Sequence, residues 1–271
     1  MFNTGIIVGL RRVLGQGQPP VAAFTGPSGG SADPAPAPTS NPFLRDDLDW
    51  EALAAAAPTR FEQLYYRHKG KVVFKWRQYL RVYDALLAPY VGKPITLVEV
   101  GVAAGGSIQL WREYLGPQAR IIGVDIDPGT LAHAGPGVEI MVGDQGNADF
   151  LRQVAERAGP IDVLIEDGSH QVDHQILTFE TLFPRVKTGG VYVCEDLHTS
   201  YWDNFGGGAG KPGTFIEYLK TMLDRMHWRY NGMPVGPDDL VRHVQQITMA
   251  DSIAVFHKGE PEDTYMVQVG G

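Results

Sequence analysis

The sequence has little of what marks secreted, membrane-spanning or nucleic-acid-binding proteins. It contains one cysteine, Cys194, so no internal disulfide can form, which fits a reducing compartment. No run reaches the roughly 18–20 apolar residues that a membrane-spanning helix needs. The formal net charge is -8 and no stripe of lysine or arginine is present, which disfavours a nucleic-acid partner. We therefore expect a cytoplasmic protein without a membrane span.

The amino-terminal part has the composition of a linker. Residues 15–43 are rich in Gly, Pro, Ser and Ala, and such a segment buries too little apolar surface to fold alone. We therefore predict an extended or flexible arm over residues 1–45. An ordered arm needs a surface to pack on, and another subunit would provide one. We accordingly expect a homo-oligomer, a dimer or higher.

The rest of the chain changes from a helical pattern to an alternation of strands and helices. Helices are predicted at 46–57 and 61–90, within a helical segment 46–94 that we expect to cover the active site. From residue 95 to 259 the alternation predicts a Rossmann-like α/β fold with a mostly parallel, seven-stranded sheet and helices on both faces, followed by a tail at 260–271. The predicted strands are 95–100, 119–127, 138–145, 161–170, 191–202 (a strand and its loop), 244–251 and 252–259.

A glycine-rich turn follows the first predicted strand. Residues 95–100 form an apolar run that is typical of a buried parallel strand, and Gly101 and Gly105 precede a predicted helix. These glycines allow a tight turn in which backbone can approach a ligand, and Ser107 is the expected N-cap of the helix. The free amide groups of a helix N-terminus make this turn a candidate binding site.

The spacing of the glycines bears on the ligand. A dinucleotide fingerprint is GxGxxG, whereas this turn reads GxxxGG after Glu99, with Ala at position 103. An acid–x–Gly–x–x–x–Gly loop resembles the first motif of class I S-adenosylmethionine-dependent methyltransferases, in which it wraps the methionine end of the cofactor. An ordinary strand–helix turn of another α/β protein is the alternative.

Polar residues follow the next two strands, at the edge where ligands bind in such sheets. Asp125 ends the second strand, 24 positions after Gly101, where an acid can accept hydrogen bonds from ribose hydroxyls. Asp144 and Gln145 end the third strand and suit the adenine amino group.

Acids also end the fourth and fifth strands. Asp167 follows the fourth strand, and Glu195 and Asp196 follow the fifth. Adjacent strands run about 4.8 Å apart, so these carboxylates would lie within reach of one cation. Carboxylates so close repel one another unless a positive charge joins them, and oxygen ligands favour Mg²⁺, Mn²⁺ or Ca²⁺. Scattered loop acids are the alternative.

His170 lies three residues after Asp167 and is the expected general base. An imidazole has a pKa of about 6.5, which suits removal of a proton from a hydroxyl group. His170 and His174 also form HxxxH, a possible zinc pair, but Gln171 replaces the glutamate of HExxH. His198 is the alternative base.

The motifs EVGVAAGGS, GVDID, GDQ, IEDGSH and CEDLHTSYW occur in one order. Over about residues 60–258 the chain therefore resembles the magnesium-dependent sugar O-methyltransferases, which include mycinamicin and rhamnosyl O-methyltransferases and mycobacterial mannose and polysaccharide methyltransferases. The resemblance implies that residues 95–259 are a class I methyltransferase domain with His170 as base and Asp167 beside it. It implies a metal held by Asp167, Glu195 and Asp196. It implies S-adenosylmethionine held by Glu99, Gly101, Gly105, Ser107, Asp125, Asp144, Gln145 and Asp167.

The resemblance also implies an acceptor, a small molecule or an oligosaccharide. Tyr201 and Trp202 are expected to stack on a sugar face, with His198 beside them. A catechol-like aromatic acceptor is the first alternative, because it too would chelate a metal through two oxygens. A metal-dependent oxygenase or hydrolase that uses His170, His174 and Asp167 is the second, and a cofactor-binding module without catalysis the third.

Overall fold

The computed structural model describes residues 43–45, 47–233 and 236–270. Nearly all of the predicted arm over 1–45 lies outside these residues. The chain divides into two compact units, one ending at His68 and the other beginning at Lys69. Within the described residues, no helix is long and apolar enough to cross a membrane.

The described part of the first unit is a pair of short helices, α2 (Trp50–Ala56) and α3 (Arg60–Arg67). The side chain of Asp49 caps α2 by accepting a hydrogen bond from the amide of Ala52, at 3.0 Å. Thr59 caps α3 in the same way, because its side-chain oxygen accepts a hydrogen bond from the amide of Glu62. The helix predicted over residues 46–57 is confirmed by α2.

The predicted helix over 61–90 is wrong, because the chain leaves the helical conformation between α3 and α4 (Tyr79–Leu87). Residues 68–78 contain Gly70 and the β-branched pair Val72 and Val73, which are weak helix formers. We call residues 69–78 the strap. A short 3₁₀ turn at Ala88–Tyr90 then leads to the first strand.

The second unit is built on one seven-stranded sheet in the order β3-β2-β1-β4-β5-β7-β6. Strands β1 to β5 are parallel, while β7 runs antiparallel to both β5 and β6, so the prediction of a mostly parallel sheet is confirmed. The strands are β1 (Thr96–Val100), β2 (Arg120–Asp125), β3 (Val138–Val142), β4 (Ile161–Glu166), β5 (Val186–Cys194), β6 (Val244–Ala250) and β7 (Ile253–Lys258). The helices are α5 (Gly106–Leu115), α6 (Ala148–Ala158), α7 (Val172–Leu182), α8 (Phe215–Met226), α9 (Trp228–Asn231) and α10 (Asp239–Arg242), and 3₁₀ turns lie at Pro128–His133, Phe183–Arg185, Leu197–Tyr201 and Asp203–Phe205.

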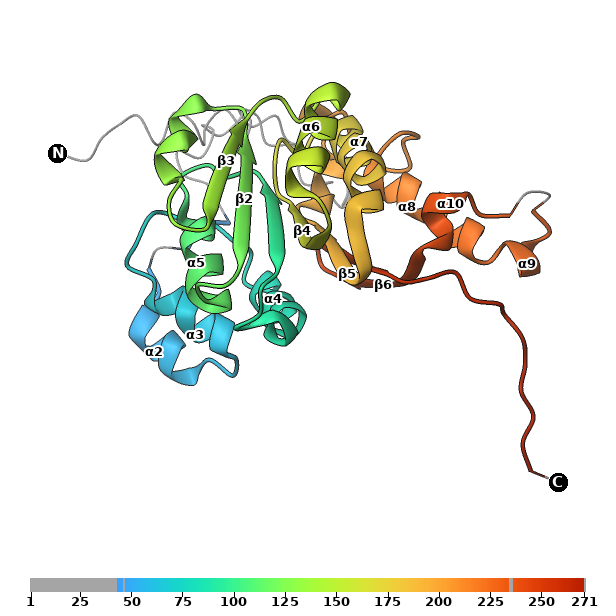
Figure 1. Ribbon diagram of the computed structural model, residues 1–271, viewed down its shortest axis with the longest axis horizontal. Helices are drawn as coiled ribbons and strands as arrows, with labels where there is room; N and C mark the ends of the chain where they lie inside the picture. Colours follow the sequence, from blue (N-terminus) through green and yellow to red (C-terminus); the bar gives the residue numbers. More distant parts are fainter. Residues whose placement is uncertain (1–42, 46, 234–235, 271) are drawn as a thin grey trace, which may run out of the picture. The chain divides into compact units, whose positions relative to one another are not determined.

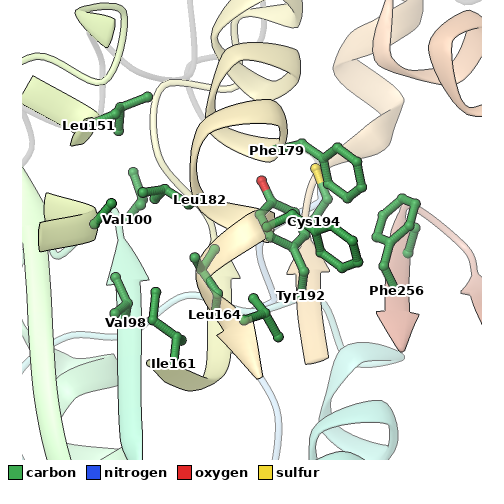
Figure 2. Packing of buried hydrophobic residues seen from close by; sticks show 14 of the residues in the cluster. Val98, Val100, Leu151, Ile161, Leu164, Phe179, Leu182, Tyr192, Cys194 and Phe256 are labelled. Carbon is green, nitrogen blue, oxygen red and sulfur yellow. The ribbon is translucent and has the colours of Figure 1, made fainter. Parts of the chain in front are cut away.

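Helices cover both faces of this sheet, because successive strand residues point to opposite sides. On one face Val98 and Val100 of β1 belong to the same buried cluster as Phe179 and Leu182 of α7 (Figure 2). Figure 1 shows α6 and α7 side by side over this part of the sheet. On the other face Glu99 bonds to α5, whose Trp111 packs on Tyr83 of α4 at 4.8 Å between ring centroids.

Two local predictions differ from the structure. Gly105, in the left-handed conformation with φ 81, is the N-cap residue of α5, and the expected cap Ser107 lies inside the helix. The fifth strand is predicted to begin at residue 191, but β5 begins at Val186 and includes Gly189 and Gly190, where the register with β4 shifts. Gly189 has φ 80, so glycine permits this irregularity without ending the strand.

Candidate active site

The turn after β1 depends on glycine because other parts of the chain lie against it. Gly101 has φ 98, and a Cβ atom there would stand 1.9 Å from the carbonyl oxygen of Asp167. At Gly105 a Cβ atom would stand 2.6 Å from the ring of His133, and at Gly106 it would stand 2.3 Å from the carbonyl oxygen of Val72. The turn is thus packed directly against the end of β4 and against the strap.

Asp125, the predicted ribose ligand, holds this turn in place. Its Oδ2 atom accepts hydrogen bonds from the amides of Val102 and Ala103, at 2.9 Å each. Its Oδ1 atom accepts a third from the amide of Asp127, at 2.9 Å. The carboxylate therefore joins the end of β2 to the glycine turn, and contact with a ribose stays a prediction.

Glu99 and Ser107 bond to each other beneath the turn. The hydroxyl of Ser107 donates to Glu99 Oε2 at 2.8 Å, and the indole of Trp111 donates to Oε1 at 2.9 Å. Glu99 is fully buried, and this burial raises its pKa to about 7 although the charge of Lys75 opposes the shift. This buried, hydrogen-bonded pair joins β1 to α5 on the two sides of the turn, and so it fixes the shape of the turn.

Asp144 and Gln145 differ in exposure and in partners. Asp144 is exposed and accepts a hydrogen bond from the backbone amide two residues later, at 2.8 Å. Gln145 is buried; its Nε2 atom donates to Glu166 at 2.6 Å and to Thr178 at 3.0 Å. Its Oε1 atom accepts from the amide of Ser169 at 2.9 Å. Gln145 thus holds the turn that leads to His170, and adenine contact stays a prediction for both residues.

Three of the predicted catalytic and metal residues converge beside the glycine turn. One ligand atom each of Asp167, His170 and Asp196 lie within 4.8 Å of one another. His170 Nε2 is 3.8 Å from Asp167 Oδ1 and 3.5 Å from Asp196 Oδ2. We call these three residues the acid cluster. His170 and Asp196 have φ values of 57 and 55, a left-handed conformation that is uncommon outside glycine and is typical of functional sites.

Glu195, the third predicted metal ligand, lies next to the acid cluster but is bonded to a lysine. The ammonium of Lys75, in the strap, donates to Glu195 Oε1 at 2.6 Å and also to Asp167 Oδ2. The hydroxyl of Tyr83 donates to the same Oε1 atom. Burial lowers the pKa of Lys75, but the charges of Asp167 and Glu195 outweigh it and hold that pKa well above its ordinary value. Lys75 is therefore a buried, charged partner of both acids.

The strap connects the glycine turn with the acid cluster. At one end the amide of Lys71 donates to Gln109 of α5 at 2.7 Å. At the other end the indole of Trp76 donates to Asp196 Oδ1 at 3.1 Å, and the hydroxyl of Tyr79 donates to the same atom at 2.9 Å. Trp76, Tyr79 and Tyr83 recur at three- and four-residue spacing, a pattern that is typical of core side chains on a helix. Their rings do pack, but each polar atom reaches an acid after β5.

Aromatic rings line the region around the acid cluster. The imidazole of His198 lies 4.5 Å from the ring of Trp202 and 5.4 Å from that of Trp76, between centroids. Phe205 lies 6.4 Å from His170 and 6.0 Å from Trp202. Trp202 and its neighbour His198 therefore lie near the acid cluster, and contact with an acceptor stays a prediction for both.

Three further predicted residues have clear positions. Tyr201 is 52% exposed. His198, the alternative base, contacts Ser252 Oγ through Nδ1 at 2.5 Å, and burial lowers its pKa. His174 contacts Ser169 Oγ at 2.9 Å, and the acid cluster found among the described residues does not include it. The HxxxH zinc pair therefore has no support in this geometry.

The residues of this site lie in a segment that matches a known protein family. Residues 98–197, which run from β1 through the turn after β5, match the model of a family described as methyltransferase domain. This chain contains a methyltransferase domain. The matched residues include the glycine turn, Asp125 and the acid cluster, so the methyltransferase domain predicted from the motifs is confirmed.

The chain is also similar in sequence to named methyltransferases. The chain is 34% identical over 218 residues to 8-demethyl-8-(2-methoxy-alpha-L-rhamnosyl)-tetracenomycin-C 3'-O-methyltransferase of Streptomyces olivaceus, covering 76% of this chain and 55% of that protein. It is 39% identical over 207 residues to 8-demethyl-8-alpha-L-rhamnosyl tetracenomycin-C 2'-O-methyltransferase of the same organism, covering 70% and 53%. The chain thus spans about half the length of these relatives.

A solved structure supports the same relation. The MycE methyltransferase from the mycinamycin biosynthetic pathway, in complex with Mg and SAH, superposes with a TM-score of 0.64 at 31% sequence identity. The alignment covers 70% of this chain and 52% of that chain. The predicted resemblance to sugar O-methyltransferases is confirmed by these similarities.

Proposed function

We propose that this protein is an S-adenosylmethionine- and Mg²⁺-dependent O-methyltransferase that methylates a sugar hydroxyl of a glycosylated natural product or oligosaccharide. The observation that carries the proposal is the acid cluster of Asp167, His170 and Asp196 beside the glycine turn. The two relatives from Streptomyces olivaceus, whose names specify O-methylation of rhamnosyl tetracenomycin-C compounds, support the acceptor class.

The cofactor site in this proposal is the glycine turn with the strand ends beside it. The backbone of Gly101 and Gly105 would approach the methionine end, and exposed Asp144 would bind at the adenine end. Asp125 would accept hydrogen bonds from the ribose with a carboxylate already held by two turn amides. Glu99 and Ser107 would act from beneath the turn by fixing its backbone.

The donor set fits a hard divalent cation. Asp167 and Asp196 offer oxygen atoms close enough for one ion, and Glu195 is the third carboxylate of the proposed set. When bound, the cation lowers the pKa of a coordinated hydroxyl group.

The base in this proposal is His170, whose Nε2 atom faces the two carboxylates. It would accept the proton of the acceptor hydroxyl as the oxygen attacks the sulfonium methyl group. The negative carboxylates on either side stabilise the imidazolium that forms. The amide of Ser169 donates to Gln145, and this bond would hold the turn that carries His170 close to the acceptor hydroxyl.

The acceptor would lie against the aromatic side chains next to the base. Trp202 and its neighbour His198 offer ring faces and edges, and Tyr201 is exposed at the same turn. A sugar has an apolar C–H face that packs on an aromatic ring, while its hydroxyls face polar groups.

Methyl transfer from labelled S-adenosylmethionine to a panel of rhamnosylated and other glycosylated acceptors tests this function. We expect transfer with Mg²⁺ and none in excess chelator. Asp196→Asn keeps the side-chain shape but removes a charge from the acid cluster, and we expect loss of turnover with cofactor affinity unchanged. Asp173→Asn, at an exposed acid three residues after His170, is the matched control. Transfer to catechols in preference to sugars would contradict the acceptor class, and full activity in chelator would contradict the cation.

A second experiment distinguishes a base from a metal ligand at position 170. Removal of a general base costs about 10²–10⁴-fold in rate, so His170→Ala should lower kcat by that order. Affinity for Mn²⁺, measured by electron paramagnetic resonance, should stay near that of the wild type. Weaker Mn²⁺ binding in this variant would make His170 a ligand instead. Retained turnover in His170→Ala with loss in His198→Ala would move the base to His198.

A further inference from the structure

Lys75 is a charged side chain inside the site that the proposed mechanism does not use. Its side chain is only 2% exposed, and its ammonium bonds to both Asp167 and Glu195, two of the three carboxylates proposed to hold the cation. These acids follow different strands, β4 and β5, so one ammonium joins two strand ends. We propose that Lys75 is an internal competitor of the divalent cation, which shares Asp167 and Glu195 with it and thereby sets the affinity of the site.

The competition follows from charge and from shared atoms. The bonds of Lys75 occupy Asp167 Oδ2 and Glu195 Oε1, while Asp167 Oδ1 lies on the side of His170. A divalent ion held by these carboxylates would lie a few ångströms from the ammonium. At an effective dielectric constant of about 20, two unit charges about 4 Å apart interact by several RT. The ammonium therefore either moves away or weakens binding of the ion.

The neighbours of Lys75 show why the lysine is held there. Tyr83 donates to the same Glu195 oxygen, and Glu99 lies near enough for its charge to act on Lys75. Without a positive charge beside them, the buried Glu195 and the partly buried Asp167 would repel each other. The ammonium thus stabilises Asp167 and Glu195 next to each other in the folded protein. Because it is attracted to these carboxylates, it opposes binding of the divalent cation. The strap also contacts the third proposed carboxylate ligand, because Trp76, next to Lys75 in the chain, is bonded to Asp196.

The inference rests on the proposed metal dependence, and Mn²⁺ affinity of the full chain tests it. Lys75→Gln keeps hydrogen-bonding capacity but removes the charge, and we expect it to bind Mn²⁺ at least tenfold tighter than the wild type. Lys75→Arg keeps the charge and should stay within about threefold. Lys187→Gln removes a lysine that is paired with Asp162 at 2.7 Å. This pair lies near the starts of β4 and β5, whereas the acids follow the ends of these strands, so the variant should leave the affinity unchanged.

Melting temperature provides a second readout that does not depend on turnover. In chelator, Lys75→Gln should melt below the wild type because Asp167 and Glu195 lose their positively charged partner. Excess Mn²⁺ should raise its melting temperature more than that of the wild type, because stabilisation by a ligand grows with the logarithm of its affinity. A Lys75→Gln protein that folds only with Mn²⁺ supports the competition. One that stays unfolded with Mn²⁺ makes Lys75 a purely structural residue and overturns it.

The outcomes separate this inference from the function on which it rests. Wild-type binding of Mn²⁺ with equal or weaker binding by Lys75→Gln overturns the competition and leaves the metal-dependent methyltransferase in place. Binding by the variant alone supports the competition in its strongest form. Binding by neither protein overturns both the metal site and its competitor.

Discussion

Substitution of Gly101 by alanine tests how the glycine turn and the acid cluster depend on each other. The added Cβ atom would stand 1.9 Å from the carbonyl oxygen of Asp167 and 2.6 Å from its carbonyl carbon, so the end of β4 must shift. Asp167 carries a carboxylate of the acid cluster. One methyl group in the cofactor turn is therefore expected to damage the metal site as well.

The magnitude has two parts. Alanine at a left-handed φ of 98 costs roughly 1–2 kcal/mol. The forced shift of backbone in a packed site adds about 1–3 kcal/mol. The sum, roughly 2–5 kcal/mol, is a large share of the 5–15 kcal/mol by which a typical domain is stable. Gly92→Ala is the matched control, because Gly92 has φ 72 but open space around its Cβ position.

Urea unfolding of both variants and Mn²⁺ titration measure these effects. Gly92→Ala should lose only the conformational part and bind Mn²⁺ like the wild type. Gly101→Ala should lose more stability and bind both Mn²⁺ and S-adenosylhomocysteine more weakly. Equal losses of stability in the two variants, or unchanged Mn²⁺ affinity in Gly101→Ala, would refute the coupling of the turn to the acid cluster.

Two further predictions concern Glu99 and Trp202. Burial raises the pKa of Glu99 to about 7 from 4.5, so the folded protein binds this proton more tightly than the unfolded chain and stability falls as pH rises through that interval. Glu99→Gln should thus gain stability relative to the wild type between pH 5 and pH 8, by up to about 3 kcal/mol, in urea unfolding; a constant difference would contradict the shift. Trp202→Ala should raise the acceptor KM by roughly three- to tenfold without changing cofactor affinity, and the opposite pattern would move Trp202 out of the acceptor site.

The sequence by itself determined the sheet on which the site is built and the acids at the ends of its strands. The apolar run over 95–100 and the alternation after it predicted a parallel sheet, and they placed Asp125, Asp167 and Asp196 at strand ends. These are local signals, because side-chain periodicity and glycine turns act over a few residues. Parallel strands then bring their carboxyl ends to one edge, so the convergence of Asp167 and Asp196 followed from topology alone.

Only the tertiary structure decided which partners those acids have. Lys75 lies 92 residues from Asp167 and 120 residues from Glu195 in the chain, and no local pattern relates them. The stripe of Tyr79 and Tyr83 has the spacing of a core helix, and periodicity does not reveal that their hydroxyls reach acids after β5. Burial makes such long-range bonds decisive, because a carboxylate removed from water must find a donor or a cation wherever the fold supplies one.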